Sequence, residues 1–368
     1  MVRTPKLRVA LTGLVAGASG RILAEVPAVV EWHRAVFFPW LAPKLQRAFG
    51  ATVSTVGEVM ALLLIGLTLG ALILYRTRGI ATLTFVFGLL VFAFYGSWGL
   101  AYRYPALSGR LSPLRATAQS EEPADRLAEL TKRSAQLATR ASSAPVSSAG
   151  PEADFLARIN GGLRDGFARL PESIEVAPVR GTVSGLVKLS RVSFAMSRLQ
   201  LAGYYFPWTG EAQINAEMPR TLWPRVGAHE EAHQRGFARE DEATVMGVLA
   251  CLSSTDPAVF YSGALGLFAG FDRELGRVDA EARRQIRASL PRRVVDDLDN
   301  EAAFWKAHEG VAGVVSEKVN DTYLKAQGVS SGIASYSETT HLFMQAVETK
   351  ATGLDLLLRV SDTASVLR

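Results

Sequence analysis

The segment HEEAHQRGFAREDEA, residues 229–243, holds the residues of this chain whose types and spacing suit catalysis. His229 and His233 are four residues apart, so on a helix both imidazoles lie on one face, where they can bind a single zinc ion. Glu230 follows the first histidine, a position from which a glutamate can take a proton from zinc-bound water. A shuffled chain of this composition would contain the HExxH pattern in fewer than about one case in a hundred.

A catalytic zinc needs a third protein ligand and one open position. Gly236 is predicted to end the helix with a positive φ, so that the chain folds back toward the metal. The spacing is similar to that of the metzincins, but Arg239 stands at the place of their third histidine and cannot bind zinc. We therefore expect Glu240 to be the third ligand, in an EDEA pattern similar to the ExxA ligand helix of glutamate-type zinc peptidases. Glu242 is the alternative ligand, or else an outer hydrogen-bond acceptor.

Composition excludes several other kinds of site. The single cysteine, Cys251, allows neither an internal disulfide nor a multi-cysteine zinc site, so a metal must be held by histidines and carboxylates. The net charge is only +5, and the basic residues form no patch interleaved with aromatics. We therefore predict no nucleic-acid partner.

The elements that must position the motif are mainly helical. A short strand is expected around residues 212–216, within GYYFPWTGEAQINAEMP. That strand is either an edge that binds extended substrate beside the metal helix or an ordinary structural strand. Helical spacing resumes at residues 243–252 and 272–290, and also from residue 153, where Gly161 and Gly162 predict a break.

Two uncharged segments, Val59–Tyr75 and Gly79–Tyr102, are predicted to be membrane spans, because about 20 apolar helical residues cross the hydrocarbon core. The short RTRG sequence between them predicts a tight hairpin with antiparallel spans. The lone Glu58 before the first span is expected to snorkel to an interface.

The apolar stretch Val9–Val30 is either a third span or a signal peptide, and Arg21 and Glu25 can pair within it. The aromatic residues that follow it, up to residue 45, suit a membrane–water interface. Basic residues precede this stretch and also occupy the hairpin at Arg76 and Arg78. If both basic groups are cytoplasmic, the chain has three spans, and everything after Tyr102 lies outside the cytoplasm.

The chain thus divides into three predicted regions. Residues 1–107 form a membrane domain with two clear transmembrane helices and one further predicted helix. Residues 108–152 form a helical and low-complexity linker, in which ASSAPVSSAGPE is typical of a flexible segment. Residues 153–368 form the domain that carries the histidine motif.

Several segments together resemble the domain-of-unknown-function 3810 family of bacterial membrane proteins, with three spans and a zincin-like metallopeptidase domain. They are VEWHRAVFFPWL, WGLAYRYPAL, TGEAQINAEMP, HEEAHQRGFAREDEA, YSGAL and VNDTYLKAQGVSSGIASYSE, and they cover most of the chain outside the linker. The resemblance implies a mainly α fold, in which N-terminal transmembrane helices precede a largely helical, zincin-like α+β domain. Thr244 departs from the asparagine usual in that family.

The expected function is a membrane-anchored zinc-dependent peptidase of the bacterial cytoplasmic membrane. Its metallopeptidase domain would lie on the extracytoplasmic side and cut a peptide or protein substrate, while the lipid bilayer holds the spans. His229, His233 and Glu240 would bind Zn²⁺, and Glu230 would be the base. Tyr336 is expected to stabilise the oxyanion, or else to belong to a structural loop. The alternative is a non-catalytic membrane protein with a structural or ligand-binding metal site.

Overall fold

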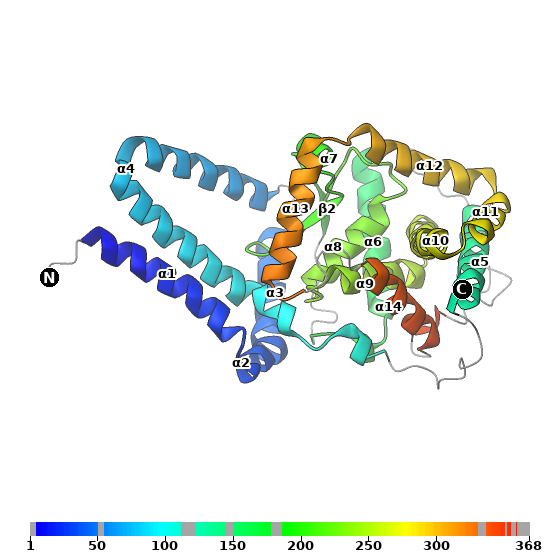
Figure 1. The fold of residues 1–368 in the computed structure, drawn as a ribbon, viewed down its shortest axis with the longest axis horizontal. Helices are drawn as coiled ribbons and strands as arrows, with labels where there is room; N and C mark the ends of the chain where they lie inside the picture. Colours follow the sequence, from blue (N-terminus) through cyan, green and yellow to red (C-terminus); the bar gives the residue numbers. More distant parts are fainter. Residues whose placement is uncertain are drawn as a thin grey trace.

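In the computed structural model, a pair of long apolar helices projects from a mostly helical domain (Figure 1). The structure describes residues 5–50, 55–111, 123–144, 150–177, 186–329, 336–349, 352–354 and 358. Most of these residues are helical, which confirms the predicted mainly α fold.

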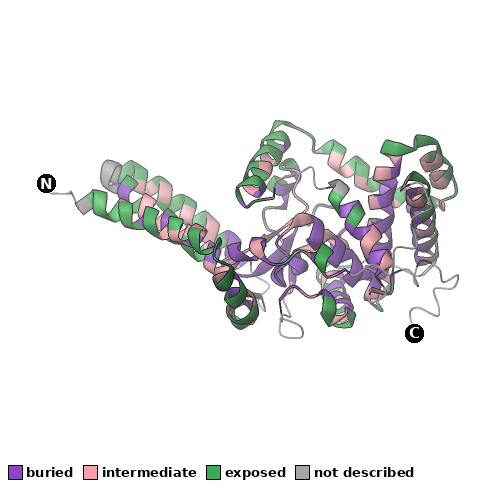
Figure 2. Cartoon of the chain, turned by 60° about the horizontal axis from the view of Figure 1, so that its bottom comes forward, coloured by how far each residue is buried: buried purple, intermediate pink, exposed green. Residues whose placement is uncertain are grey.

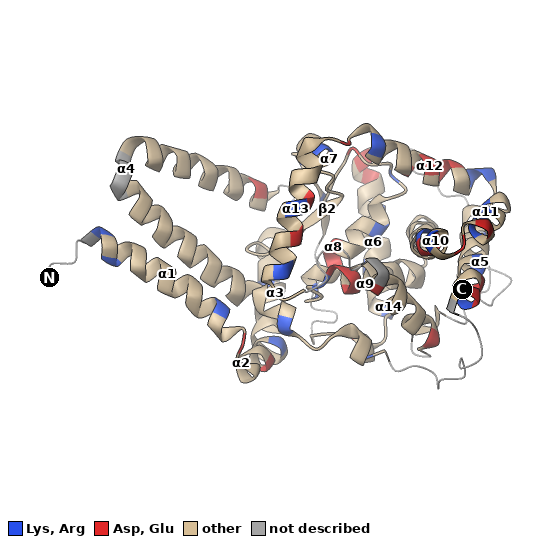
Figure 3. Ribbon diagram, viewed as in Figure 1, with Lys and Arg blue, Asp and Glu red and all other residues tan. Residues whose placement is uncertain are grey.

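Two membrane-length helical segments are confirmed, both within α4 (Val56–Ser97). They are Val56–Leu74 and Gly79–Ser97, of 19 residues each, and α4 reverses direction between them (Figure 1). Only 11% and 22% of the two segments are buried, and their other residues are exposed or partly exposed (Figure 2). Charged residues lie almost entirely outside them (Figure 3). Such exposed apolar surface suits the hydrocarbon core of a bilayer.

Helix α1 (Pro5–Leu23) lies along the second half of α4. Their backbones meet where Gly13 faces Gly88, so closely that a Cβ on Gly88 would overlap the carbonyl of Gly13. The chain then bends by 84° into the helical stretch Pro27–Gly50. That stretch is assigned as α2 (Pro27–Trp32), η1 (His33–Phe37), α3 (Phe38–Leu45) and η2 (Gln46–Gly50). Helix α1 and the stretch Pro27–Gly50 are long and apolar enough for a further span only when the two are counted together.

A three-stranded sheet lies beside the histidine motif, in the order β1-β3-β2. Its strands are β1 (Val187–Leu189), β2 (Gly203–Phe206) and β3 (Glu211–Ile214), with β1 parallel and β2 antiparallel to β3. The strand predicted around residues 212–216 is therefore present as β3. Of the two alternatives left open for this strand, the structure excludes the edge, because β3 is paired on both sides and β2 is the edge strand nearest the motif.

The rest of the domain is built from helices around one core, in which Phe268 and Phe271 are fully buried. The helices are α5 (Pro123–Ser142), α6 (Glu152–Arg169), α7 (Ser193–Arg198), α8 (Trp223–Gln234), α9 (Glu240–Ser253), α10 (Pro257–Val278), α11 (Ala280–Ala288), α12 (Arg292–Ala307), α13 (Val311–Ala326) and α14 (Tyr336–Glu348), with short 3-10 segments η3 (Gly99–Arg103), η4 (Leu107–Gly109) and η5 (Glu172–Ile174).

The predicted linker contains an integral part of this core. Helix α5 packs against α10 and buries Leu127, Leu130 and Leu137. Residues 145–149, within the predicted flexible segment, lie outside the described residues. The predicted break at Gly161 and Gly162 is wrong, because α6 runs through both glycines.

The first half of α4 is bound to the sheet at its N-terminal end. The buried carboxylate of Glu211, on β3, accepts hydrogen bonds from the backbone N–H groups of Val56 and Gly57, at 3.0 and 2.6 Å. Glu58 is also buried and accepts from the hydroxyls of Ser190 and Tyr204. Glu58 therefore does not snorkel to an interface as predicted but ties the membrane-length helix α4 to the domain.

Candidate metal centre

Helix α8 carries both histidines of the motif and ends where the sequence predicts. Pro224 occupies its first turn, where a missing backbone N–H does no harm. Gly236 follows with φ of +93°, and its N–H donates to the carbonyl of His233 at 3.0 Å. The left-handed backbone at Gly236 stops the helix and turns the chain back. Helix α9 then begins at Glu240, beside α8, and so starts before the helical stretch predicted for residues 243–252.

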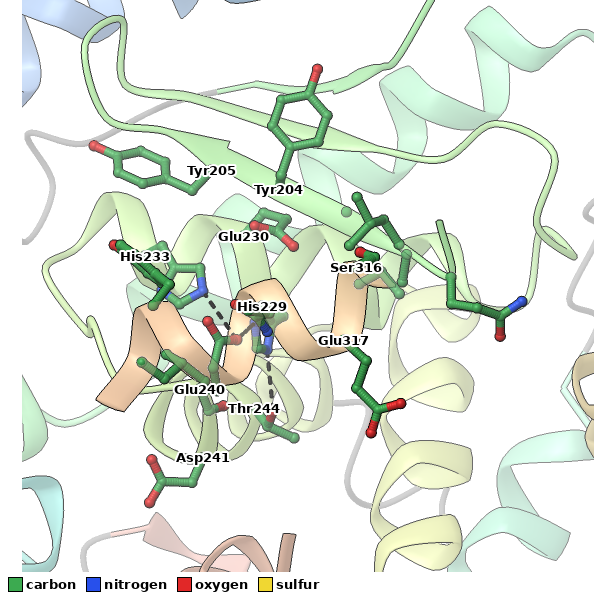
Figure 4. A pocket seen from close by; sticks show the side chains of 18 of the residues that line it. Tyr204, Tyr205, His229, Glu230, His233, Glu240, Asp241, Thr244, Ser316 and Glu317 are labelled. Atoms are coloured by element: carbon green, nitrogen blue, oxygen red, sulfur yellow. Dashed lines mark hydrogen bonds and ion pairs between the residues drawn. The ribbon is translucent and has the colours of Figure 1, made fainter. Parts of the chain in front are cut away.

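The reversal brings Glu240 onto both histidines (Figure 4). Its Oε2 lies 3.0 Å from Nε2 of His229 and 3.7 Å from Nε2 of His233. One ligand atom from each of the three residues lies within 4.8 Å of the other two, which is close enough for one metal ion. Two imidazoles and one carboxylate are a donor set that zinc accepts, and it leaves a position open.

The outer nitrogen of each imidazole has a hydrogen-bond partner. Nδ1 of His233 donates to the carbonyl of Phe237 at 2.6 Å. Nδ1 of His229 lies 3.2 Å from the hydroxyl of Thr244, which itself donates to the carbonyl of Glu240. When the imidazoles are neutral, both Nε2 atoms therefore face the centre with the lone pair that a metal requires. Thr244 thus supports the orientation of the His229 imidazole.

The charges of the three residues are strongly linked. Burial disfavours the charged imidazolium of His233, yet the nearby carboxylates of Glu240 and Glu230 raise its pKa. Although burial also acts against the charged form of Glu240, the two histidines hold the pKa of this carboxyl well below its usual range. In the absence of metal the cluster thus favours a positive charge beside an ionised carboxylate, and a metal ion would replace the imidazole proton.

Glu230 lies between α8 and the edge strand β2 (Figure 4). Burial raises the pKa of this carboxyl to about 7, against the opposing charges of the two histidines. The room for it comes from Gly203, because a Cβ there would stand 2.6 Å from Oε1 of Glu230. A carboxyl with a pKa near neutrality is well suited to accept and return a proton.

Two other predicted site residues are placed differently. Glu242 is buried away from the histidines, and its Oε1 accepts the backbone N–H of Leu107 at 2.9 Å. The structure thus groups Glu240, and not Glu242, with the histidines. Tyr336 is the first residue of α14, but its side chain lies outside the described part of the structure.

Several aromatic residues surround the site. The sequence had not indicated that they belong to it. Trp98, directly after α4, stands edge-on to His233 and donates its indole N–H to the backbone carbonyl of His233. The hydroxyl of Tyr102 donates to that of Tyr323 on α13 at 3.2 Å. Tyr205 on β2 has its ring 6.3 Å from the imidazole of His233. The available signal was the run WGLAYRY, whose polar aromatic residues follow a span directly.

The site opens into a large cavity of about 1820 Å³. One wall consists of the motif on α8 and α9 together with β2. The second half of α4 forms another wall, and α13 crosses in front of the site (Figure 4). The cavity therefore joins the metal-type cluster to a membrane-length helix.

Fold and site together define a mostly helical protein with membrane-length helices and a two-histidine, one-glutamate cluster. The family model described as "Protein of unknown function (DUF3810)" matches residues 34–344, and the chain belongs to this family. No curated protein and no solved structure matches the chain at a significant level.

Proposed function

We propose that the protein is a membrane-anchored zinc-dependent peptidase whose domain is zincin-like. The observation that carries this proposal is the convergence of His229, His233 and Glu240 with the buried carboxyl of Glu230 beside them. A structural metal site has no use for such a carboxyl in a cavity that reaches the surface. The spacing of the two histidines and the base on one helix supports a peptidase in particular.

The residues present fit a zinc ion. Nε2 of His229, Nε2 of His233 and a carboxylate oxygen of Glu240 would hold it, since both Nδ1 atoms are already engaged. When bound, zinc would acidify a water molecule and polarise the carbonyl of a peptide bond.

Residues of the chain would supply the base, the oxyanion donor and the substrate-binding strand. Glu230 would accept a proton and pass it to the leaving amine, for which a pKa of about 7 is suitable. The hydroxyl of Tyr323 stays protonated because burial raises its pKa, so it can donate a hydrogen bond to developing negative charge. The edge strand β2 borders the cavity through Gly203, Tyr204 and Tyr205, and would pair with an extended substrate. A role for Tyr336 in this step stays a prediction.

We further propose that the chain has three spans and a cytoplasmic N-terminus in the bacterial cytoplasmic membrane. The packing of α1 along α4 supports a retained α1, because a transient signal segment has no need of close backbone contact with a later helix. The basic residues near the start of α1 and at the turn of α4 favour the cytoplasmic side. The domain would then lie outside the cytoplasm.

Zinc content and peptide hydrolysis test this function in detergent-purified protein. We expect about one zinc per chain in the wild type, as a three-ligand catalytic site requires, and loss of zinc in His233→Ala and Glu240→Ala. Glu242→Gln is the matched control and should keep zinc, because the carboxyl of Glu242 accepts a hydrogen bond from the backbone N–H of Leu107 and does not face the histidines. Glu230→Gln should keep zinc but abolish hydrolysis.

Two results would contradict the proposal. Well-folded wild type without zinc would exclude it. Zinc binding without hydrolysis of any peptide in a randomised library would leave a structural or ligand-binding metal site.

A further inference from the structure

The cavity at the metal-type cluster extends along a membrane-length helix. Phe87, Leu90 and Phe94 line it, and all three belong to the segment Gly79–Ser97. Phe87 is ten residues before the end of that segment, which is about 15 Å along a helix. One end of the cavity thus lies at a depth where a membrane-spanning α4 is surrounded by hydrocarbon.

Helix α13 also lines this cavity, and it meets α4 where the rings of Phe94 and Tyr323 lie 6.4 Å apart. Of its residues, Gly313 and Leu324 are buried, while Val311, Val314 and Val315 are 81%, 67% and 55% exposed. Val314, Val315 and Val319 line the cavity together with α4. Ser316, Glu317 and Asn320 of α13 also line the cavity. We call its apolar part the α4–α13 groove, defined by Phe87, Leu90 and Phe94 on α4 and by Val315 and Val319 on α13.

The far end of the same cavity has a different character. Arg225, Arg273, Glu274 and Glu301 line it, on α8, α10 and α12. The histidines and Glu240 line the same cavity, on α8 and α9. An occupant that matches the whole cavity therefore has an apolar part at bilayer depth and a polar chain that passes the metal site.

The exposed valines on α13 form an apolar surface patch. Removing such a patch from water is stabilising, so we expect it to contact lipid or a binding partner. The groove that they line is continuous with the lipid-facing surface of α4, where Phe87 is 66% exposed. That continuity favours the bilayer and molecules inserted in it over a soluble partner.

We infer that the α4–α13 groove opens sideways to the bilayer and takes peptides that carry a membrane-inserted apolar segment, cut close to the membrane surface. This inference rests on the proposed peptidase function for the cutting step. The opening itself rests only on the position of the groove.

Spin labels test the opening without catalysis. Cys251 is fully buried, so a nitroxide reagent will label a cysteine introduced at Val315, or at Val278 as a matched exposed valine at the end of α10. In vesicles of phosphatidylethanolamine and phosphatidylglycerol, the label at Val315 should collide more with oxygen than with a water-soluble nickel chelate. The label at Val278 should show the reverse. A label at Val315 that collides mainly with the nickel chelate would overturn the inference.

Hydrolysis tests the substrate class. Randomised quenched-fluorescence peptides are offered in the same vesicles, either free or fused to an apolar membrane-spanning segment. The anchored form should be cut on the order of 100-fold faster, since anchoring raises its local concentration. Val315→Asp should lower the ratio of the anchored to the free cutting rate toward one, and Val278→Asp should leave this ratio at its wild-type value.

The two failures are distinguishable. Equal rates for anchored and free peptides would overturn the membrane-anchored substrate class and leave the peptidase proposal intact. If neither peptide is cut, the peptidase proposal fails and the proposed substrate class fails with it. In either case the collision data alone show whether the groove faces lipid.

Discussion

The indole of Trp98 stands at 86° to the imidazole of His233, with ring centroids 5.6 Å apart, and donates its N–H to the backbone carbonyl of His233 at 3.1 Å. Trp98 is the residue that follows α4, and His233 lies in the last turn of α8. The end of a membrane-length helix is therefore in direct contact with a candidate metal ligand.

Trp98→Phe should lower zinc affinity about tenfold, because it keeps an aromatic ring beside His233 but removes the hydrogen bond that fixes the end of α8. Competition with a chelator measures the affinity. Trp223→Phe is the matched control, since Trp223 is equally buried and donates to the carbonyl of Met218, away from the cluster. It should reduce stability without reducing zinc affinity. Equal zinc affinities in Trp98→Phe and wild type would show that the contact is only structural.

Gly203→Ala should reduce peptide hydrolysis by about 10- to 100-fold while zinc content stays unchanged. The added Cβ would stand 2.6 Å from Oε1 of Glu230 and 2.8 Å from the carbonyl of Gln213, so the base or the edge strand must move. Gly161→Ala is the control, because a Cβ there has open space and alanine favours the helix. Wild-type turnover in Gly203→Ala would mean that Glu230 is not the base.

The site was largely predictable from the sequence because its determinants are local. HExxH fixes two imidazoles and a carboxylate on one helical face, and Gly236 fixes the reversal that brings Glu240 back. The choice of Glu240 over Glu242 depends on the register of α9. Only the structure shows that the carboxyl of Glu242 is held by the backbone of Leu107, which is 135 residues away in the chain.

What the sequence could not provide depends on contacts between distant segments. Gly161 and Gly162 are typical of a helix break, but α6 continues because Gly162 and Gly166 let it approach α9 and α10 closely. Whether β3 is an edge or an internal strand could not be decided from the sequence, because no local signal predicts the three-residue strand β1 that pairs with it. Likewise the role of Trp98 depends on its contact with His233, which is 135 residues away in the chain.

Glu211→Gln should destabilise the domain by about 3–5 kcal/mol, since it removes a fully buried carboxylate that neutralises Lys188 and accepts the first N–H groups of α4. Chemical unfolding in detergent measures the free energy. Asp296→Asn breaks an exposed ion pair with Arg292 and should change stability by less than about 1 kcal/mol. If the two variants are equally stable, α4 is not anchored through this carboxylate.

Gly88→Val should separate α1 from α4 and lower the free energy of unfolding by about 1–3 kcal/mol, the usual effect of overpacking. A side chain at residue 88 would overlap the backbone of Gly13, whereas Gly70, in the first half of the same helix, has open space around it. Gly70→Val is therefore the matched control and should be nearly neutral.

The comparison of Gly88→Val with Gly70→Val also distinguishes a third span from a signal peptide at residues 9–30. If α1 is a retained span, the intact mass of the purified protein includes it and Gly88→Val lowers the melting temperature, but Gly70→Val does not. If the segment were a cleaved signal peptide, the mass would lack α1. Gly88 would then face lipid, as Gly70 does, and both valine variants would behave alike. Close backbone contact of this kind is how small residues hold helices together in a membrane, so we expect the first outcome.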